Sequence, residues 1–170
     1  MVSIDANFET TDSTRKSFGD ADGRVMVHSN ELPWTPWALE GMSFKLLSIN
    51  RRSGMWVCII RIDPNVKTDL HYHFGDAIIF ATKGSYRYEM DRVGTGEQNI
   101  EIGSIAHEPI FDERGAEVYV IFNGGLSGSN GERKPVGEYV NVEWMYEAAK
   151  ANGAAEHLMP PPFVRASLVE

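Results

Sequence analysis

Residues 70–76 read Leu-His-Tyr-His-Phe-Gly-Asp, and this stretch decides the fold class because it sets two histidines two positions apart. Side chains at that spacing on a β-strand project from the same face, so His71 and His73 can direct two imidazoles at one metal ion. Two histidines are an incomplete site, and a bare pair is also compatible with surface or hydrogen-bonded histidines. The residues around the pair must therefore distinguish these alternatives.

Short strand-like runs separated by turn residues surround the histidine pair. The runs cover residues 44–48, 55–62, 77–80, 86–90, 99–102 and 118–122. Residues typical of turns stand between them at 52–54, 63–65, 83–85, 94–96 and 123–125. This regular spacing predicts an all-β sandwich or barrel, and the alternation of strands and helices typical of a parallel sheet is missing.

The chain length of 170 residues favours a single domain with one packed core. We expect a loosely ordered N-terminal arm at 1–30, a barrel at 31–125, a flexible connection rich in Gly, Ser and Asn at 126–140, and a C-terminal helix with a Pro-rich tail at 141–170. Asn141 is the expected N-cap of the helix, and Asn152-Gly153 is its expected stop. The helix is expected to close one end of the barrel.

The charge and composition exclude several classes of protein. A net charge of -8 argues against a nucleic-acid-binding surface. No apolar run approaches the length of a membrane span and the N-terminus lacks a signal-peptide pattern, so a cytoplasmic protein without membrane contact is expected. The only cysteine, Cys58, lies in an apolar run and is expected to be a buried thiol. His28 and His157 lie in polar segments and are expected at the surface.

Further residues at motif spacing carry a family resemblance. They are Pro-Trp at 33–34, Gly41 followed by Phe-Lys-Leu-Leu at 44–47, the pair His71 and His73, Gly-Ser-Tyr-Arg-Tyr at 84–88, and Gly103 followed six residues later by Pro109. Over about residues 34–122 the chain resembles the cupin superfamily (RmlC-like). It looks most like the group of 2,4'-dihydroxyacetophenone dioxygenase and acetylacetone-cleaving dioxygenase.

This resemblance implies a single-domain cupin β-barrel, a double-stranded β-helix of jelly-roll type, followed by a C-terminal helix. It also implies a non-haem Fe(II) ion held by three histidines, sometimes with a glutamate, and cleavage of a carbon–carbon bond with dioxygen. His71 and His73 match the first two ligands. Fe(II) is the expected metal, although imidazole ligands also suit Zn, Ni or Mn.

The expected position of the third histidine holds Arg114, which stays protonated and does not coordinate a metal. Arg114 has two interpretations. It either forms a salt bridge with Asp112, Glu113 or Glu117, or it points inward as a catalytic cation that stabilises an anionic or enolised substrate.

Two other residues are candidates for the missing ligands. His107 shares strand parity with Ile105 and faces inward if Ile105 does, which makes it either a relocated third ligand or a hydrogen-bonded core histidine. The candidate for the family glutamate is Glu89. Alternation with Tyr86 and Tyr88 turns Glu89 away from the core unless a bulge shifts the strand by one residue.

Three functions remain open at this level. The leading hypothesis is a non-haem Fe(II) dioxygenase that cleaves a small β-diketone, hydroxyketone or aromatic ketone. The alternative is a non-catalytic small-molecule binding or sensing cupin with a degenerate metal site, and a third is a metal-assisted isomerase or hydrolase on the same barrel. A homodimer is expected, because open barrels commonly pair their exposed strand edges.

Overall fold

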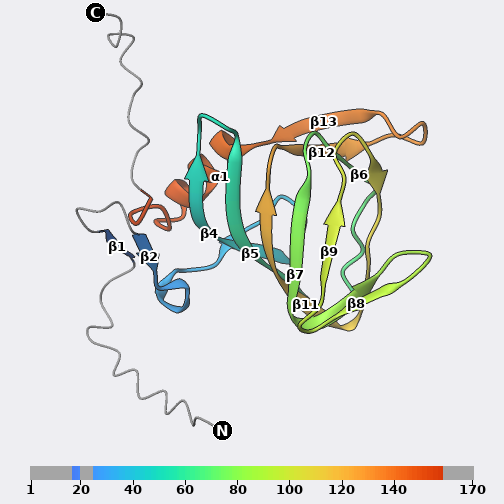
Figure 1. Cartoon of the computed structure of the whole chain (residues 1–170), viewed down its shortest axis with the longest axis horizontal. Coiled ribbons are helices and arrows are strands. Elements are labelled where there is room, and N and C mark those ends of the chain that lie inside the picture. Colours follow the sequence, from blue (N-terminus) through green and yellow to red (C-terminus); the bar gives the residue numbers. More distant parts are fainter. Residues whose placement is uncertain (1–16, 20–24, 159–170) are drawn as a thin grey trace, which may run out of the picture.

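The computed structural model describes residues 17–19 and 25–158 (Figure 1). Most of the expected N-terminal arm and the Pro-rich tail lie outside the described residues. The described elements are the strands β1 (Ser17–Gly19), β2 (Val25–Val27), β3 (Thr35–Pro36), β4 (Met42–Asn50), β5 (Met55–Ile62), β6 (His71–His73), β7 (Ala77–Arg87), β8 (Arg92–Gly94), β9 (Gln98–Glu101), β10 (Ala106–His107), β11 (Ile110–Phe122), β12 (Leu126–Ser129) and β13 (Pro135–Val140), with a 3-10 turn η1 (Ser29–Glu31) and one helix, α1 (Val142–Ala151).

Two antiparallel sheets form the body of the molecule, as the all-β pattern predicts. The larger sheet has the order β3-β4-β5-β11-β7-β8, with β9 also paired to β7, and the smaller has the order β10-β6-β12-β13. β1 and β2 form a separate pair. In Figure 1 the strands β12 and β13 run across the ends of β7 and β11. Residues from both sheets line one cavity, so the two sheets enclose an interior space.

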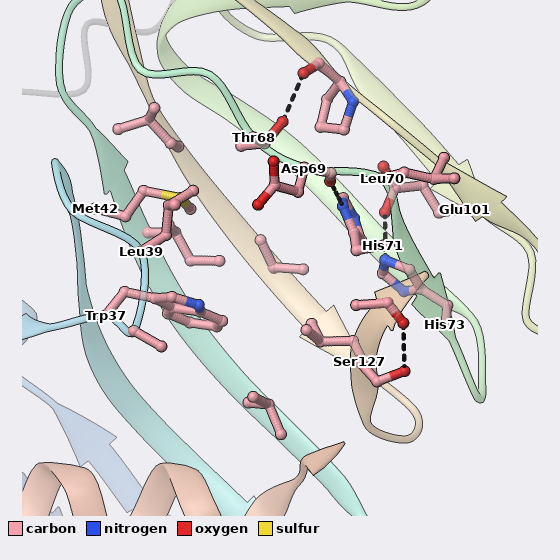
Figure 2. Close-up of a pocket in the computed structure, with 18 of the residues that line it drawn as sticks. Trp37, Leu39, Met42, Thr68, Asp69, Leu70, His71, His73, Glu101 and Ser127 are labelled. Carbon is pink, nitrogen blue, oxygen red and sulfur yellow. Dashed lines mark hydrogen bonds and ion pairs between the residues drawn. The ribbon is translucent and has the colours of Figure 1, made fainter. Parts of the chain in front are cut away.

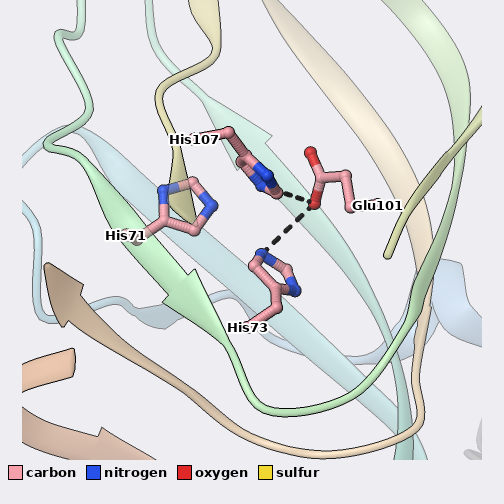
Figure 3. Close-up of side chains that lie close together, drawn as sticks. All are labelled: His71, His73, Glu101 and His107. Atoms are coloured by element: carbon pink, nitrogen blue, oxygen red, sulfur yellow. Dashed lines mark ion pairs between the residues drawn. The ribbon is translucent and has the colours of Figure 1, made fainter. Parts of the chain in front are cut away.

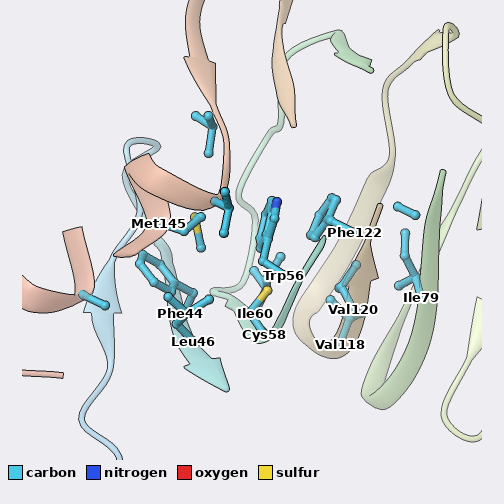
Figure 4. Close-up of a cluster of buried hydrophobic side chains, with 14 of the residues drawn as sticks. Phe44, Leu46, Trp56, Cys58, Ile60, Ile79, Val118, Val120, Phe122 and Met145 are labelled. Carbon is cyan, nitrogen blue, oxygen red and sulfur yellow. The ribbon is translucent and has the colours of Figure 1, made fainter. Parts of the chain in front are cut away.

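The hydrophobic core is formed by apolar side chains of β4, β5, β7, β11 and α1 (Figure 4). Trp56 is fully buried and stacks on Phe122, with ring centroids 3.8 Å apart, and its Nε1 donates a hydrogen bond to the carbonyl oxygen of Gly124 at 2.8 Å. Burying a large apolar side chain contributes roughly 1.5–3 kcal/mol. Cys58 is a buried free thiol, as predicted.

The turn predicted at 83–85 is wrong, because β7 runs without interruption from Ala77 to Arg87. Gly84 and Gly115 both adopt a positive φ, at +68° and +69°, where the pairing of β7 with β11 shifts register. A Cβ at Gly84 would collide with the carbonyl oxygen of Gly115. Glycine at this position therefore permits a β-bulge and a close approach of two backbones. In the sequence, a glycine at a bulge looks the same as a glycine in a turn.

The connection expected to be flexible at 126–140 instead contains β12 and β13. β12 pairs with β6, so that Leu126 lies opposite His73 and Gly128 lies opposite His71. β13 pairs with β12 and places Pro135 opposite Ser129. This Gly-rich segment is ordered by backbone hydrogen bonds within the smaller sheet. Because it has no alternating side-chain pattern, its composition did not predict the two strands.

The C-terminal helix forms where the sequence predicts it. The side chain of Asn141 accepts hydrogen bonds from the backbone N–H groups of Glu143 and Trp144, and Gly153 follows the helix with φ +65°. The helix packs against β4 and β13 through Val142, Met145 and Ala149. Within residues 17–19 and 25–158, no helix has the length and apolar character needed to cross a membrane.

The two histidines expected at the surface differ in placement. His28 is exposed. His157 is buried, and its Nε2 lies 2.7 Å from the carbonyl oxygen of Leu46, so the prediction for His157 is wrong. The residues after α1 fold back onto β4 and bury Ala154, Ala155 and Leu158, which a polar local sequence does not reveal.

Candidate metal centre

Three strands bring three histidines and one glutamate together inside the barrel (Figure 3). His71 and His73 project from the same face of β6, as their spacing predicts. β10 pairs antiparallel with β6 in a register that sets His107 directly opposite His71. Glu101 is the last residue of β9 and reaches the group from the larger sheet.

The four side chains offer their ligand atoms to one small space. One nitrogen of each histidine and one oxygen of Glu101 all lie within 4.8 Å of one another. Oε2 of Glu101 is 3.2 Å from Nε2 of His73 and 3.1 Å from Nε2 of His107. Both nitrogens are buried without an aligned hydrogen-bond partner among the described residues. Buried polar atoms that converge in this way without hydrogen bonds fit the donor set of a metal ion.

Burial disfavours the charged form of His71 and His73, which suits these two histidines to metal binding. It lowers the pKa of His73 to about 4 and also lowers the pKa of His71. A neutral imidazole has the free electron pair that a metal needs. Burial alone would raise the pKa of Glu101, but its close contacts with His107 and His73 outweigh burial and hold the pKa below the ordinary value. At neutral pH the centre therefore presents the neutral imidazoles of His71 and His73 and the ionised carboxylate of Glu101.

Outer contacts orient two of these groups. Nδ1 of His71 lies 3.2 Å from the backbone carbonyl oxygen of Asp69, and an N–H at that position leaves the opposite ring nitrogen free as a ligand. The hydroxyl of Tyr88 donates a hydrogen bond to Oε1 of Glu101. Burial raises the pKa of Tyr88, and the charge of Glu101 raises it further, so the phenol remains a protonated donor.

A cavity of about 460 Å³ opens directly onto the centre (Figure 2). His71, His73 and Glu101 form part of its wall, and most of the remaining wall is apolar. Trp37, Leu39, Met42, Ile60, Ile79, Phe111, Val118, Val120 and Phe122 supply the apolar side chains. Figure 2 shows the carboxylate of Asp69 directed away from His71 toward Leu39 and Met42. The arrangement provides a place for an organic molecule beside a bound ion.

The strand pattern missed Glu101. The run at 99–102 was predicted only as a strand, with no role for its polar residues, and its Ile100 and Ile102 are 56% and 62% exposed. Asn99 and Glu101 point inward instead, and Glu101 is buried. The available signal was the position of Glu101, six residues before His107, on a strand whose polar residues alternate.

Glu89, the residue proposed for the glutamate role, lies elsewhere. It is exposed in the turn after β7 and is outside the four-residue cluster. β7 ends at Arg87, so no bulge rotates Glu89 into the barrel.

Arg114 lies on the outside of the protein. Its side chain is 73% exposed, and its guanidinium contacts the carboxylate of Asp112 at 3.4 Å. The salt-bridge interpretation therefore describes Arg114, and the interpretation as an inward cation does not. Arg114 stands in the segment between Phe111 and Ala116 where the pairing of β11 with β7 is irregular, and it is not among the residues that line the cavity.

His107 does join the centre, although the parity argument for it fails. Ile105 is 45% exposed and so does not define an inward face. Ser104 adopts φ +67°, which interrupts the extended backbone, and β10 is only the two residues Ala106 and His107. The pairing of β10 with β6, and not the parity of a longer strand, directs His107 at His71.

The chain is similar in sequence to one protein family and in structure to several solved proteins. Residues 22–127 match the model of the ChrR cupin-like domain. A putative acetylacetone dioxygenase from Methylibium petroleiphilum PM1 superposes with a TM-score of 0.65 at 21% identity, over 72% of this chain and 92% of that one. An acetylacetone dioxygenase from Acinetobacter johnsonii gives a TM-score of 0.64 at 19% identity, over 83% and 99% of the two chains.

A third structure, an RmlC-like cupin protein from Ralstonia eutropha JMP134, gives a TM-score of 0.67 at 20% identity, over 77% of this chain and 87% of that one. No curated protein sequence matches the chain significantly. Identities near 20% indicate a shared fold and leave the reaction of this chain to be argued from its own residues.

Proposed function

Because the chain belongs to the ChrR cupin-like family and has the cupin β-barrel that its sequence predicted, we propose that it is a metal-dependent oxygenase. In this proposal it is a non-haem Fe(II) dioxygenase that cleaves a carbon–carbon bond in a small β-diketone, hydroxyketone or aromatic ketone. One molecule of dioxygen is consumed for each substrate molecule, and both oxygen atoms enter the products.

The observation that carries the proposal is the convergence of His71, His73, Glu101 and His107 on one point at the wall of an apolar cavity. Three imidazoles and a carboxylate suit Fe(II), and they also suit Mn, Ni or Zn. Four protein donors leave positions free on an ion that accepts six ligands. A ferrous ion, when bound, supplies the redox chemistry that dioxygen needs to react with an organic substrate.

The protein's own side chains bind and shield the substrate. Apolar residues such as Trp37, Met42 and Phe122 exclude water from the cavity and favour the hydrocarbon part of a ketone. His71 and His73 lie on the cavity wall, so a carbonyl group bound there faces the metal centre. The contact between Asp69 and His71 keeps that imidazole in a single orientation during binding.

The charge distribution of the cavity favours an uncharged substrate. Among the described residues that line it, Asp69, Glu101 and Glu138 are acidic, and none is a lysine or an arginine. Arg114, the cation that would have attracted an anionic substrate, is outside the cavity. We therefore propose a neutral ketone that becomes enolised only after binding.

The alternative of a non-catalytic sensing cupin rested on two apparent losses, the third histidine and the glutamate. His107 and Glu101 supply one residue of each kind within the cluster. The argument for a degenerate site therefore loses its basis, and the oxygenase is the better supported function.

Oxygen uptake by reconstituted protein tests the proposal. Untagged protein is loaded anaerobically with Fe(II) and mixed with a β-diketone, a hydroxyketone and an aryl ketone, and dioxygen consumption is followed with an electrode. Reactions in ¹⁸O₂ with product mass spectrometry should find one labelled atom in each of two fragments. The control is His28→Ala, since His28 is exposed and outside the cluster.

The expected result is stoichiometric oxygen uptake in the wild type and His28→Ala, and loss of uptake in His107→Ala. Iron-loaded wild type that consumes no oxygen with any of these ketones would contradict the dioxygenase proposal. Turnover of a ketone in the absence of dioxygen would instead favour the isomerase or hydrolase.

A further inference from the structure

The two carboxylate oxygens of Glu101 have different partners. Oε2 faces the imidazoles of His73 and His107, at 3.2 and 3.1 Å. Oε1 accepts a hydrogen bond from the hydroxyl of Tyr88. The carboxylate is buried, so water is not freely available to replace either contact. The two oxygens are therefore held in two separate environments.

We propose that Tyr88 is a positioning residue that engages Oε1 of Glu101 and so limits this carboxylate to presenting the single oxygen Oε2 to the metal centre. The inference rests on the proposed metal site, but not on the identity of the reaction. A carboxylate that binds an ion through both oxygens occupies two positions around it, whereas one held by a neighbouring donor occupies one. The position left free is available to a substrate or to dioxygen.

Packing and backbone contacts hold the Tyr88 side chain in place for this role. Its ring meets the ring of His107 edge to face, with centroids 5.7 Å apart, and meets the ring of Tyr86 at 90° with centroids 6.0 Å apart. The backbone N–H of Tyr88 donates to the carbonyl oxygen of Asp91 at 2.9 Å, which closes the turn after β7. The phenol thus contacts one expected ligand through its hydroxyl and another through its ring.

The chain contains a matched pair that serves as an internal control. Two residues earlier on β7, the hydroxyl of Tyr86 donates a hydrogen bond to Oδ1 of Asn99, which precedes Glu101 by two residues on β9. Both tyrosines line the cavity and both bond to an inward side chain of β9. Asn99, however, is not part of the metal cluster. Tyr86→Phe therefore removes an equivalent hydrogen bond without releasing an expected ligand.

The test uses Co(II), whose visible absorption becomes weaker as its coordination number rises. Metal-free wild type, Tyr88→Phe and Tyr86→Phe are titrated with Co(II), the spectra are recorded, and the affinities are measured by competition with a chelator. Tyr88→Phe should show weaker and shifted Co(II) bands and an affinity reduced about tenfold, the lower end of typical outer-contact effects. Tyr86→Phe should retain the wild-type spectrum and affinity. Thermal unfolding of the metal-free variants measures how far each midpoint falls when the hydrogen bond of Tyr88 or of Tyr86 is removed.

A wild-type spectrum and affinity in Tyr88→Phe would overturn the inference while leaving the metal site intact. A wild-type protein that binds no Co(II) would overturn both the inference and the metal-dependent function. If Tyr88→Phe does not fold, a crystal structure of the Zn-loaded wild type decides the point. Contact of the ion with Oε2 alone is expected there, and contact with both oxygens of Glu101 would overturn the inference.

Discussion

His107 lies directly opposite His71 across the antiparallel pair formed by β10 and β6. Side chains of directly opposed residues project from the same face of a sheet, about 4.5–5.5 Å apart at their Cβ atoms. This pairing brings a histidine that is 36 positions away in the sequence within reach of the pair on β6. Although β10 has only two residues, its pairing with β6 is enough to place His107 beside His71.

Metal content should depend on His107 as strongly as on His73. We expect untagged wild-type protein to carry near-stoichiometric divalent metal by mass spectrometry, and His73→Ala and His107→Ala to lose most of it, because each removes one of four donors. His28→Ala, at an exposed position, should retain the wild-type content. Full metal content in His107→Ala would show that this histidine is a core residue and not a ligand.

The stability of the metal-free protein should fall as the pH is lowered from 6.5 toward 5. His73 has an ordinary pKa of 6.5 when unfolded and a pKa of about 4 when folded. In this window the unfolded state takes up a proton that the folded state refuses, so acid favours unfolding by up to about 1.4 kcal/mol per pH unit. His71, whose pKa is also lowered, acts in the same direction.

Chemical denaturation at several pH values measures this dependence. His73→Asn should reduce the slope of unfolding free energy against pH between 6.5 and 5, whereas His28→Asn should leave it unchanged. An identical slope in His73→Asn and in the wild type would exclude His73 as a source of the acid sensitivity.

The carboxylate of Asp69 should disfavour anionic ligands in the cavity. Two ketones of similar shape, one neutral and one carrying a carboxylate, are compared by calorimetry on Zn-loaded protein. Asp69→Asn should strengthen binding of the anionic ketone roughly fivefold, since two charges 4 Å apart in water interact by about 1 kcal/mol. The neutral ketone should be unaffected. Glu89→Gln, at an exposed position outside the cavity lining, is the control. Equal effects on both ketones would argue against an electrostatic role.

Gly84→Ala should destabilise the barrel more than Gly96→Ala does. Both glycines have a positive φ, so alanine is strained by about 1–2 kcal/mol at either site. Only at Gly84 does an added Cβ collide with backbone, the carbonyl oxygen of Gly115, whereas nothing lies within 4 Å at Gly96. Denaturant unfolding of the two variants compares them. Equal losses would show that β7 and β11 move apart easily at the bulge.

The local sequence determined the features that depend on neighbouring residues. The regular spacing of strand-like runs and turns predicted an all-β sandwich or barrel, and the spacing of His71 and His73 predicted two imidazoles on one face, and both are present. Asn141 and Gly153 predicted the ends of α1, because caps satisfy backbone groups within one turn. These features need no knowledge of distant parts of the chain.

Only the tertiary structure decided which residues complete the centre. Glu101 points inward because β9 joins β7 in a register that turns Ile100 outward, and that choice depends on residues 18 to 24 positions away. Arg114 lies at the surface beside the bulge at Gly115, and the pairing of β10 with β6 directs His107 to the cluster that could hold a metal. Strand alternation defines two faces but does not say which is inside, because the pairing partners and bulges that assign the faces are distant in sequence.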